Sequence, residues 1–214
     1  MRHFSTNLTM GGIKMAIELK KGSKINLSKD NKSLGEVLIN LNWSQHGTSK
    51  QSLIKSLFSK EKPVDLDLGC LFELKDGTKG CVQALGNRFG SLDRPPYVFL
   101  DGDDRTGSNE NGETLKFNAN KISEIKRILV YTYIYEGVAN WAEIDGIVTI
   151  KQNLSEDIII KMDEYSNSKN MCALAMISND NDNCLVEKIV EYYNGHVNLD
   201  KAFNWGLNWV AGRK

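Results

Sequence analysis

Apolar residues alternate with polar residues in many short segments of this chain, and this period of two constrains the fold more than any other feature. In the segment LGEVLINLNW, the side chains of Val37, Ile39, Leu41 and Trp43 fall on one face, as they do in a half-buried β-strand. The segment Lys126–Tyr135 (KRILVYTYIY) is rich in β-branched and aromatic residues, which favour strands. Other segments of the same character include Val64–Leu74, Lys79–Gln83, Tyr97–Leu100, Ile144–Lys151, Met171–Ser178 and Leu185–Tyr193.

These segments are separated by clusters of Asn, Asp, Ser and Gly, which are typical of turns. Short strands at such spacing predict an all-β fold: a β-sandwich of about ten short antiparallel strands with little helix. We expect one short helix at the C-terminal end, at Leu199–Leu207. Leu85–Pro96, which contains two adjacent prolines, is expected to be a loop.

The length of 214 residues suits a single domain, which we expect to cover residues 15–214. Met1–Lys14 shows no strand pattern, so it is expected to be a disordered arm or a mis-annotated start ahead of Met15. Residues 45–62 interrupt the alternation and are expected to form an exposed linker.

A small apolar group in this linker is a candidate docking element. Leu53, Ile54, Leu57 and Phe58 have helical spacing and are surrounded by lysines. Two interpretations are open. The group packs back onto the sandwich, as apolar side chains usually do, or it docks on a partner protein or an anionic membrane surface.

The composition excludes several classes of protein. Lysine plus arginine (27) equals aspartate plus glutamate (27), which argues against a nucleic-acid-binding protein. The four cysteines form no CxxC motif and are predicted to be free thiols in a reducing compartment. No apolar run approaches the roughly 20 residues of a membrane span, and no hydrophobic signal region is seen at the start, so the cytoplasm is the expected location.

The segment Asp101–Glu113 holds five carboxylates against one arginine and lies between two expected strands. Like charges in one short loop are costly unless solvent or a cation screens them. Calcium binds six to eight oxygens from carboxylates, amides and carbonyls, and this loop contains all three kinds of donor. The spacing is not that of an EF-hand, and a solvated turn remains the alternative.

A second pair of carboxylates strengthens the calcium interpretation. Asp65 and Asp67 are two residues apart in an otherwise apolar strand, so both should point to one face. They could complete a cation site with the acidic loop. The candidate metal ligands are Asp65, Asp67, Asp101, Asp103, Asp104, Glu110 and Glu113.

The sequence shows no arrangement typical of catalysis, so we expect that the protein is not an enzyme. His3, His46 and His196 have no plausible nucleophile nearby in the sequence, and neither a phosphate-binding P-loop nor a dinucleotide-binding motif is present. Two functions remain: a calcium-binding interaction module, or a receptor for a small ligand such as a cyclic nucleotide or sugar, with calcium in a structural role.

Several motifs together resemble the TerD-domain family of tellurium-resistance and stress proteins, most closely its TerA branch. They are DLDLGCL (Asp65–Leu71), VQALGN (Val82–Asn87), LDGDDRTG (Leu100–Gly107), YIYEG (Tyr133–Gly137) and WGLNW (Trp205–Trp209). In the acidic loop Gly102, Asp103, Thr106 and Gly107 match the family pattern, whereas Asn109–Gly112 departs from it.

The resemblance implies a calcium-binding β-sandwich without known catalysis. It further implies a role in resistance to tellurite and other stresses, within a membrane-associated complex of tellurium-resistance proteins. The expected location is therefore cytoplasmic, or peripheral at the inner face of the membrane. The departure in the acidic loop favours one calcium site over two.

Overall fold

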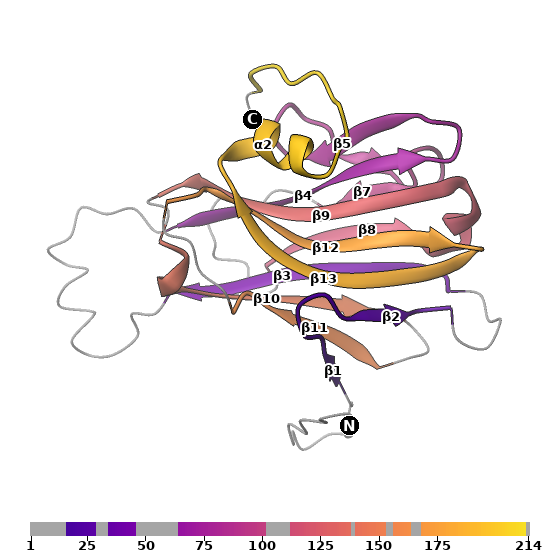
Figure 1. Ribbon diagram of the computed structural model, residues 1–214, viewed down its shortest axis with the longest axis horizontal. Coiled ribbons are helices and arrows are strands. Elements are labelled where there is room, and N and C mark those ends of the chain that lie inside the picture. Colours follow the sequence, from indigo (N-terminus) through magenta and orange to yellow (C-terminus); the bar gives the residue numbers. More distant parts are fainter. Residues whose placement is uncertain are drawn as a thin grey trace, which may run out of the picture.

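The alternating segments form two β-sheets that face each other in the computed structural model, which describes residues 16–28, 34–45, 64–101, 112–137, 140–152, 156–163 and 168–212 (Figure 1). The first sheet contains, in spatial order, β1 (Ala16–Glu18), β11 (Asp157–Lys161), β10 (Ile144–Lys151), β3 (Glu36–Gln45), β8 (Glu113–Asn118), β7 (Val98–Leu100) and β6 (Gly90–Ser91). The second sheet contains β2 (Lys24–Asn26), β13 (Asn183–Tyr193), β12 (Met171–Asp180), β9 (Ile125–Glu136), β4 (Asp65–Leu74) and β5 (Lys79–Gln83).

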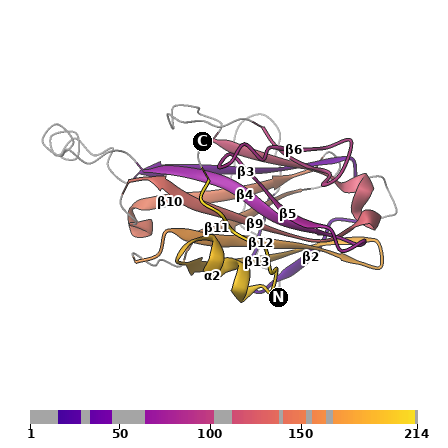
Figure 2. The same cartoon turned by 90° about the horizontal axis from the view of Figure 1, so that it is seen from above.

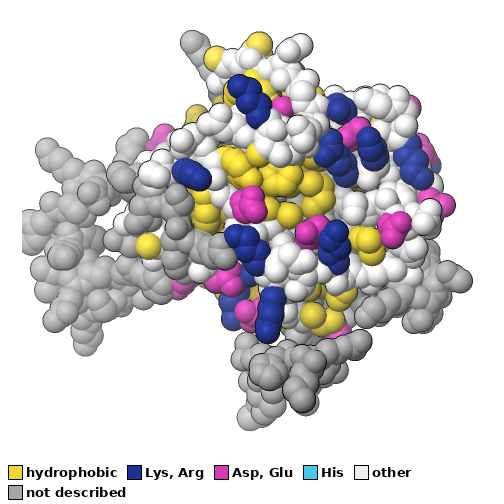
Figure 3. Space-filling view, in the orientation of Figure 1, with side chains coloured by type: hydrophobic (Ala, Val, Ile, Leu, Met, Phe, Trp, Pro, Cys, Tyr) yellow, Lys and Arg dark blue, Asp and Glu magenta, His cyan; other side chains and the backbone are white. Residues whose placement is uncertain are grey.

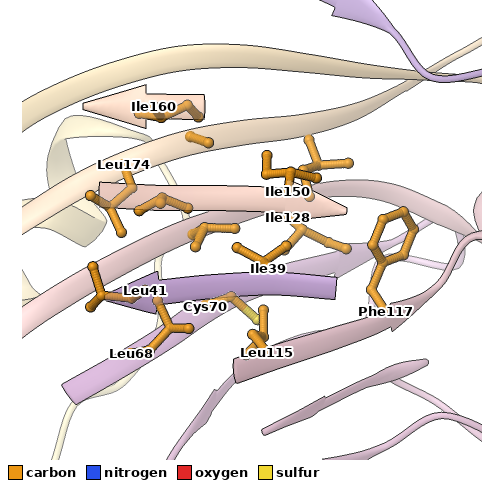
Figure 4. Close-up of a cluster of buried hydrophobic side chains, with 14 of the residues drawn as sticks. Ile39, Leu41, Leu68, Cys70, Leu115, Phe117, Ile128, Ile150, Ile160 and Leu174 are labelled. Atoms are coloured by element: carbon orange, nitrogen blue, oxygen red, sulfur yellow. The ribbon is translucent and has the colours of Figure 1, made fainter. Parts of the chain in front are cut away.

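The main core lies between the sheets because every second residue of each strand points inward. On β8 the buried positions are Glu113, Leu115 and Phe117, and the two apolar ones belong to the core. Figure 4 shows the side chain of Leu115 beside that of Cys70 of β4, in the same cluster as Ile39 of β3 and Phe117. Burial of such side chains is the main stabilising contribution to a fold of this kind.

A second apolar cluster covers the outer face of the second sheet. It contains Leu71, Leu129, Tyr131, Tyr133, Met171, Ala173, Leu199 and Trp205. The helix α2 (Gly195–Ala202) and the segment Phe203–Gly212, which we name the C-terminal strap, lie on this face (Figures 1 and 2). In the space-filling view of the same face, hydrophobic side chains gather near the centre with charged side chains around them (Figure 3).

The structure confirms the predicted all-β sandwich and corrects it in three places. β1 pairs with β11 in parallel, although the other paired strands are antiparallel. The expected loop at Leu85–Pro96 contains the short strand β6. The C-terminal helix ends at Ala202 and does not continue to Leu207.

The early end of α2 has a local cause. The carboxylate of Asp200 accepts hydrogen bonds from the backbone N–H groups of Gly206 (2.8 Å) and Leu207 (2.9 Å). Asn204 (φ 54°) and Gly206 (φ 77°) adopt left-handed backbone conformations there, which end a right-handed helix.

Three other predictions concern cysteines, termini and membranes. All four cysteines are free, and Cys70, Cys172 and Cys184 are buried, as predicted. The expected arm at residues 1–14 and nearly all of the expected linker at 45–62 lie outside the described residues. Within the described part of the chain, no helix has the length and apolar character needed to cross a membrane.

Candidate metal centre

Two buried acidic residues lie on β4 of one sheet and on β8 of the other, where these two strands approach each other. Asp67 on β4 is 1% exposed and Glu113 on β8 is 2% exposed. The backbone N–H of Leu68, the residue after Asp67, donates a hydrogen bond of 2.5 Å to Oε2 of Glu113. The Glu113 carboxylate thus binds the backbone directly next to Asp67, although 46 positions separate the two residues in the sequence.

The different lengths of two neighbouring strands make this contact geometrically accessible. β5 pairs with β4 only from Gly69 to Glu73, so the first residues of β4 extend beyond the end of β5. At this uncovered edge Glu113 reaches across from the first sheet and satisfies the N–H of Leu68. A buried backbone N–H needs such a partner, because leaving it unsatisfied costs free energy.

Gly112 sets the entry of the chain into β8. Its φ angle is +63°, and a Cβ atom at this position would collide with the carbonyl oxygen of Leu41 on β3. Glycine alone combines this backbone conformation with such a close approach. At this glycine the chain enters β8 with Glu113 buried.

Tyr133 of β9 is the cross-strand partner of Asp67. Burial raises the pKa of the Tyr133 hydroxyl above its usual value, and the charges of Asp67 and Glu113 raise it further. The hydroxyl of Tyr133 thus stays protonated at neutral pH. Two carboxylates and one phenol oxygen share this end of the sandwich.

The remaining predicted ligands have different positions. Asp65 begins β4, is partly buried, and lies opposite Glu136 at a point where the β4–β9 register shifts. The carboxylate of Asp101 is half-exposed and forms a 2.6 Å ion pair with Lys116, and the Asp101 N–H donates to the carbonyl of Thr114.

Three predicted ligands, Asp103, Asp104 and Glu110, lie outside the described residues, and so do the candidate docking residues Leu53, Ile54, Leu57 and Phe58. Among the residues that are described, no group of three or more His, Cys, Asp or Glu side chains could hold a metal ion. A complete metal centre at Asp67 and Glu113 would therefore need donors from the acidic segment between β7 and β8. The ligand assignments stay predictions.

The structure also brings together residues to which the sequence analysis gave no role. His196 of α2 lies 5.6 Å from the ring of Tyr131 and 5.1 Å from the ring of Tyr133, measured between centroids. Its Nε2 is 2.9 Å from Oε1 of Gln83, which also accepts a hydrogen bond from the Tyr131 hydroxyl. Burial lowers the pKa of His196 to about 4, so the imidazole is neutral at pH 7.

The C-terminal strap lies over this group. The ring of Trp209 lies 4.7 Å from that of His196, and its indole N–H donates to Asp200 at 3.1 Å. Part of this arrangement has a signal in the sequence: WGLNW and YIYEG are among the motifs singled out there. No comparable signal marks His196 or Asp200.

Comparisons with known proteins show which family the chain resembles. The family model described as the TerD domain matches residues 15–177. The tellurium resistance protein TerA of Alcaligenes sp. is 40% identical over 200 residues, which is 90% of this chain and 59% of that relative. The chain thus spans less than two thirds of the length of the relative it matches.

Solved structures support the fold. A homologue of the telluride resistance protein TerD from Streptomyces coelicolor A3(2) superposes with a TM-score of 0.55 at 16% identity, covering 76% of this chain and 92% of that one. A protein of unknown function gives a TM-score of 0.56 at 12% identity, covering 77% and 92%. From the family match and the identity to TerA, the chain belongs to the TerD-domain family of tellurium-resistance proteins.

Proposed function

We propose that this protein is a non-catalytic, calcium-binding module that contributes to tellurium resistance and stress response through protein complexes. The observation that carries the proposal is that two acidic residues, Asp67 and Glu113, are buried at the same end of β4, with the Glu113 carboxylate bound to the backbone next to Asp67. Two like charges in a low-dielectric interior raise the free energy of the folded state, and a bound cation reverses this effect.

The donor atoms fit calcium better than other common metals. Carboxylate and phenol oxygens are hard ligands, whereas zinc and copper prefer nitrogen and sulfur. Asp67 and Glu113 would supply the buried part of the cage, Asp65 would lie at its edge, and Asp103, Asp104 and Glu110 would complete it. The ion would supply positive charge and would fix the acidic segment on the sandwich. Asp101, the first residue of that segment, would be held in place by its ion pair with Lys116.

The cellular part of the proposal follows from relatives. TerA, the relative at 40% identity, is named as a tellurium resistance protein. We expect this chain to act in the cytoplasm, or at the inner face of the membrane, together with other tellurium-resistance proteins. Co-purification of the tagged chain from cells exposed to tellurite, with and without calcium, would identify these partners.

Calorimetric titration of the full chain with calcium tests the molecular part. We expect saturable binding, with magnesium competing poorly because it requires a tight octahedral site. Calcium at about 100 times its Kd should stabilise the fold by about 2.7 kcal/mol. Asp67→Asn and Glu113→Gln should each abolish most of this binding.

The matched control is Glu73→Gln, which changes a carboxylate of similar burial (4% exposed) on the same strand. This variant should still bind calcium. The assignment is wrong if wild type shows no calcium heat, or if Glu73→Gln loses binding as much as Asp67→Asn does. If titration with a cyclic nucleotide or a sugar releases or absorbs heat in a saturable way, the protein is instead a small-ligand receptor.

A further inference from the structure

The described part of the chain covers the outer face of the second sheet only in part. Where α2 lies on this face, His196 contacts the rings of Tyr131 and Tyr133, and these two tyrosines are 0% and 5% exposed. Next to them, apolar side chains pack against the same outer cluster but are only partly buried. We name four of these residues the open patch: Met176 of β12, Ile189 and Tyr193 of β13, and Phe203 of the strap.

The open patch continues the buried apolar cluster toward solvent. Met176 lies opposite Leu129 of β9, which is fully buried in that cluster. The ring of Tyr193 meets that of Phe203 edge-on, with 5.9 Å between the centroids. In the space-filling view, hydrophobic side chains are visible at the centre of this face (Figure 3). An apolar surface that stays accessible beside a charged border is typical of a protein-interaction surface.

Helix α2 adds an exposed aliphatic side chain to the same face. Val197 is 47% exposed, although α2 packs on β12 and β13, the two strands that carry Met176 and Ile189. Leu199 of the same helix is fully buried in the outer cluster, so it fixes α2 on the sheet. The Val197 side chain is therefore accessible to a partner that covers the open patch.

The charged side chains around the open patch have both signs. Glu187 of β13 lies opposite Met176 and forms a 3.1 Å ion pair with Lys24 of β2. Glu191 projects from the same face of β13, and Arg127 projects from the same face of the sheet on β9. A partner with one sign of charge, such as a nucleic acid or an anionic membrane, would meet like charges along this border. The border fits a partner that carries both signs.

We propose that the open patch is a self-association surface, through which two copies of this chain form a symmetric dimer. A twofold interface uses the same surface on both copies, so that surface must be complementary to itself. An apolar centre with a border of both signs meets this condition. The chain has equal numbers of basic (27) and acidic (27) residues, so two copies carry no net charge that would keep them apart. This inference goes beyond the proposed function and does not depend on calcium.

Sedimentation equilibrium of the full chain in calcium-free buffer tests the dimer. The average mass of the wild type should rise with concentration from that of one chain to that of two. Val197→Lys should raise the Kd of the dimer about tenfold or more, because it places a charge in an apolar contact. Ile147→Lys is the matched control, since Ile147 is an aliphatic residue of similar exposure (39%) on β10 of the first sheet. Its dimer Kd should stay unchanged.

Charge reversal tests the symmetry of the contact. Glu187→Lys leaves this ion-pair position with two basic residues, and Lys24→Glu leaves it with two acidic ones. Each variant alone should dimerise more weakly than the wild type, because two copies then bring an excess of the same charge to the border. An equimolar mixture of the two variants should recover dimers at low salt and lose them again at high salt.

Three results would overturn the proposal. One is a wild type that keeps the mass of a single chain up to the highest soluble concentration, which would leave the patch to a different partner. Another is equal weakening by Val197→Lys and Ile147→Lys, which would place the contact elsewhere. The third is a mixture of the charge variants that dimerises no better than either alone. Val197→Ser provides a second variant if Val197→Lys does not fold. Calcium binding is measured separately by calorimetry, so the dimer and the proposed function can fail independently.

Discussion

Two buried carboxylates on the same face of β4 have opposite surroundings. Glu73 lies near the end of the strand and Asp67 near its start, and they are 4% and 1% exposed. On the neighbouring strand β9, the residue opposite Glu73 is Arg127 and the residue opposite Asp67 is Tyr133. One position is paired with a cation and the other with a phenol.

The surroundings of Glu73 are those of a structural ion pair. Its carboxylate accepts from Lys126 at 2.7 Å and from Arg127 at 2.6 Å, and Lys79 lies at 3.8 Å. Burial acts to raise the pKa of Glu73, but the hydrogen bonds and charges of Lys126 and Arg127 outweigh it and lower the pKa below its usual value. The protein itself supplies the positive charge that this carboxylate needs.

At the other end of the strand a second carboxylate approaches the backbone next to Asp67. Glu113 comes from the opposite sheet and binds the N–H of Leu68, next to Asp67. Burial and hydrogen bonding are thus shared by both ends, but the charge of the neighbours differs. The comparison shows that burial of an acidic side chain alone does not distinguish a structural position from a binding position.

The largest effect is expected from Arg127→Leu. Arg127 pairs with Glu73, donates to the carbonyls of Phe203 and Asn204, and lies over Trp205. Removing one partner of a buried pair leaves a poorly compensated charge, so unfolding in urea should show a loss of roughly 3 kcal/mol. Lys126→Ala is the matched control, because Lys126 binds the same carboxylate from an exposed position (60% exposed); it should cost less than about 1 kcal/mol. Equal losses would show that the burial of Arg127 is not what matters.

The second-largest effect is expected from acid, which should destabilise the surroundings of Asp67 but not those of Glu73. The pKa of His196 falls through burial from its usual 6.5 to about 4 in the folded protein, so the neutral imidazole stabilises the fold above pH 6.5. That stability decreases as the pH falls from 6.5 toward 4, by roughly 2 kcal/mol at pH 5. Glu73, with its lowered pKa, keeps its ion pairs throughout this range.

Urea unfolding at pH 7 and pH 5 measures this dependence, and His196→Phe is the matched variant. Phenylalanine keeps an aromatic ring beside Tyr131 and Trp209 but does not titrate. The stability difference between pH 7 and pH 5 should become smaller in the variant by about 2 kcal/mol. An unchanged difference would assign the acid sensitivity to other groups.

Much of the fold follows from local sequence patterns. β5 (Lys79–Gln83) and β10 (Ile144–Lys151) have the predicted bounds, because strand alternation and the flanking turn residues depend on neighbours in the sequence. The parallel pairing of β1 with β11 joins segments about 140 positions apart, and no local pattern specifies it. The end of α2 depends on Asp200 binding the N–H groups of Gly206 and Leu207, which apolar spacing does not reveal.

For the candidate metal centre, the sequence predicts acidic residues and the structure supplies their neighbours. The sequence predicts Asp67 from a pair of aspartates on one strand face and Glu113 from the acidic loop, and the structure places the Glu113 carboxylate on the backbone next to Asp67; that they bind calcium stays a prediction. Tyr133 of β9 lies opposite Asp67, and its ring contacts that of His196, which in turn contacts that of Trp209. Their roles depend on contacts between distant segments, so one sequence by itself does not assign them.

The smallest effect is expected from Asp67→Asn in a metal-free buffer. This variant tests the comparison most directly, because it should stabilise the fold, whereas the corresponding change at Glu73 should destabilise it. Asparagine has nearly the same shape as aspartate, but it removes one of the two buried charges at this end of the strand. Relief of that repulsion should stabilise the fold by about 1 kcal/mol, measured by urea unfolding with a calcium chelator present. Glu73→Gln should instead destabilise it by about 1–2 kcal/mol, because Arg127 and Lys126 lose their anionic partner. A loss of similar size in both variants would mean that Asp67, like Glu73, is a structural charge.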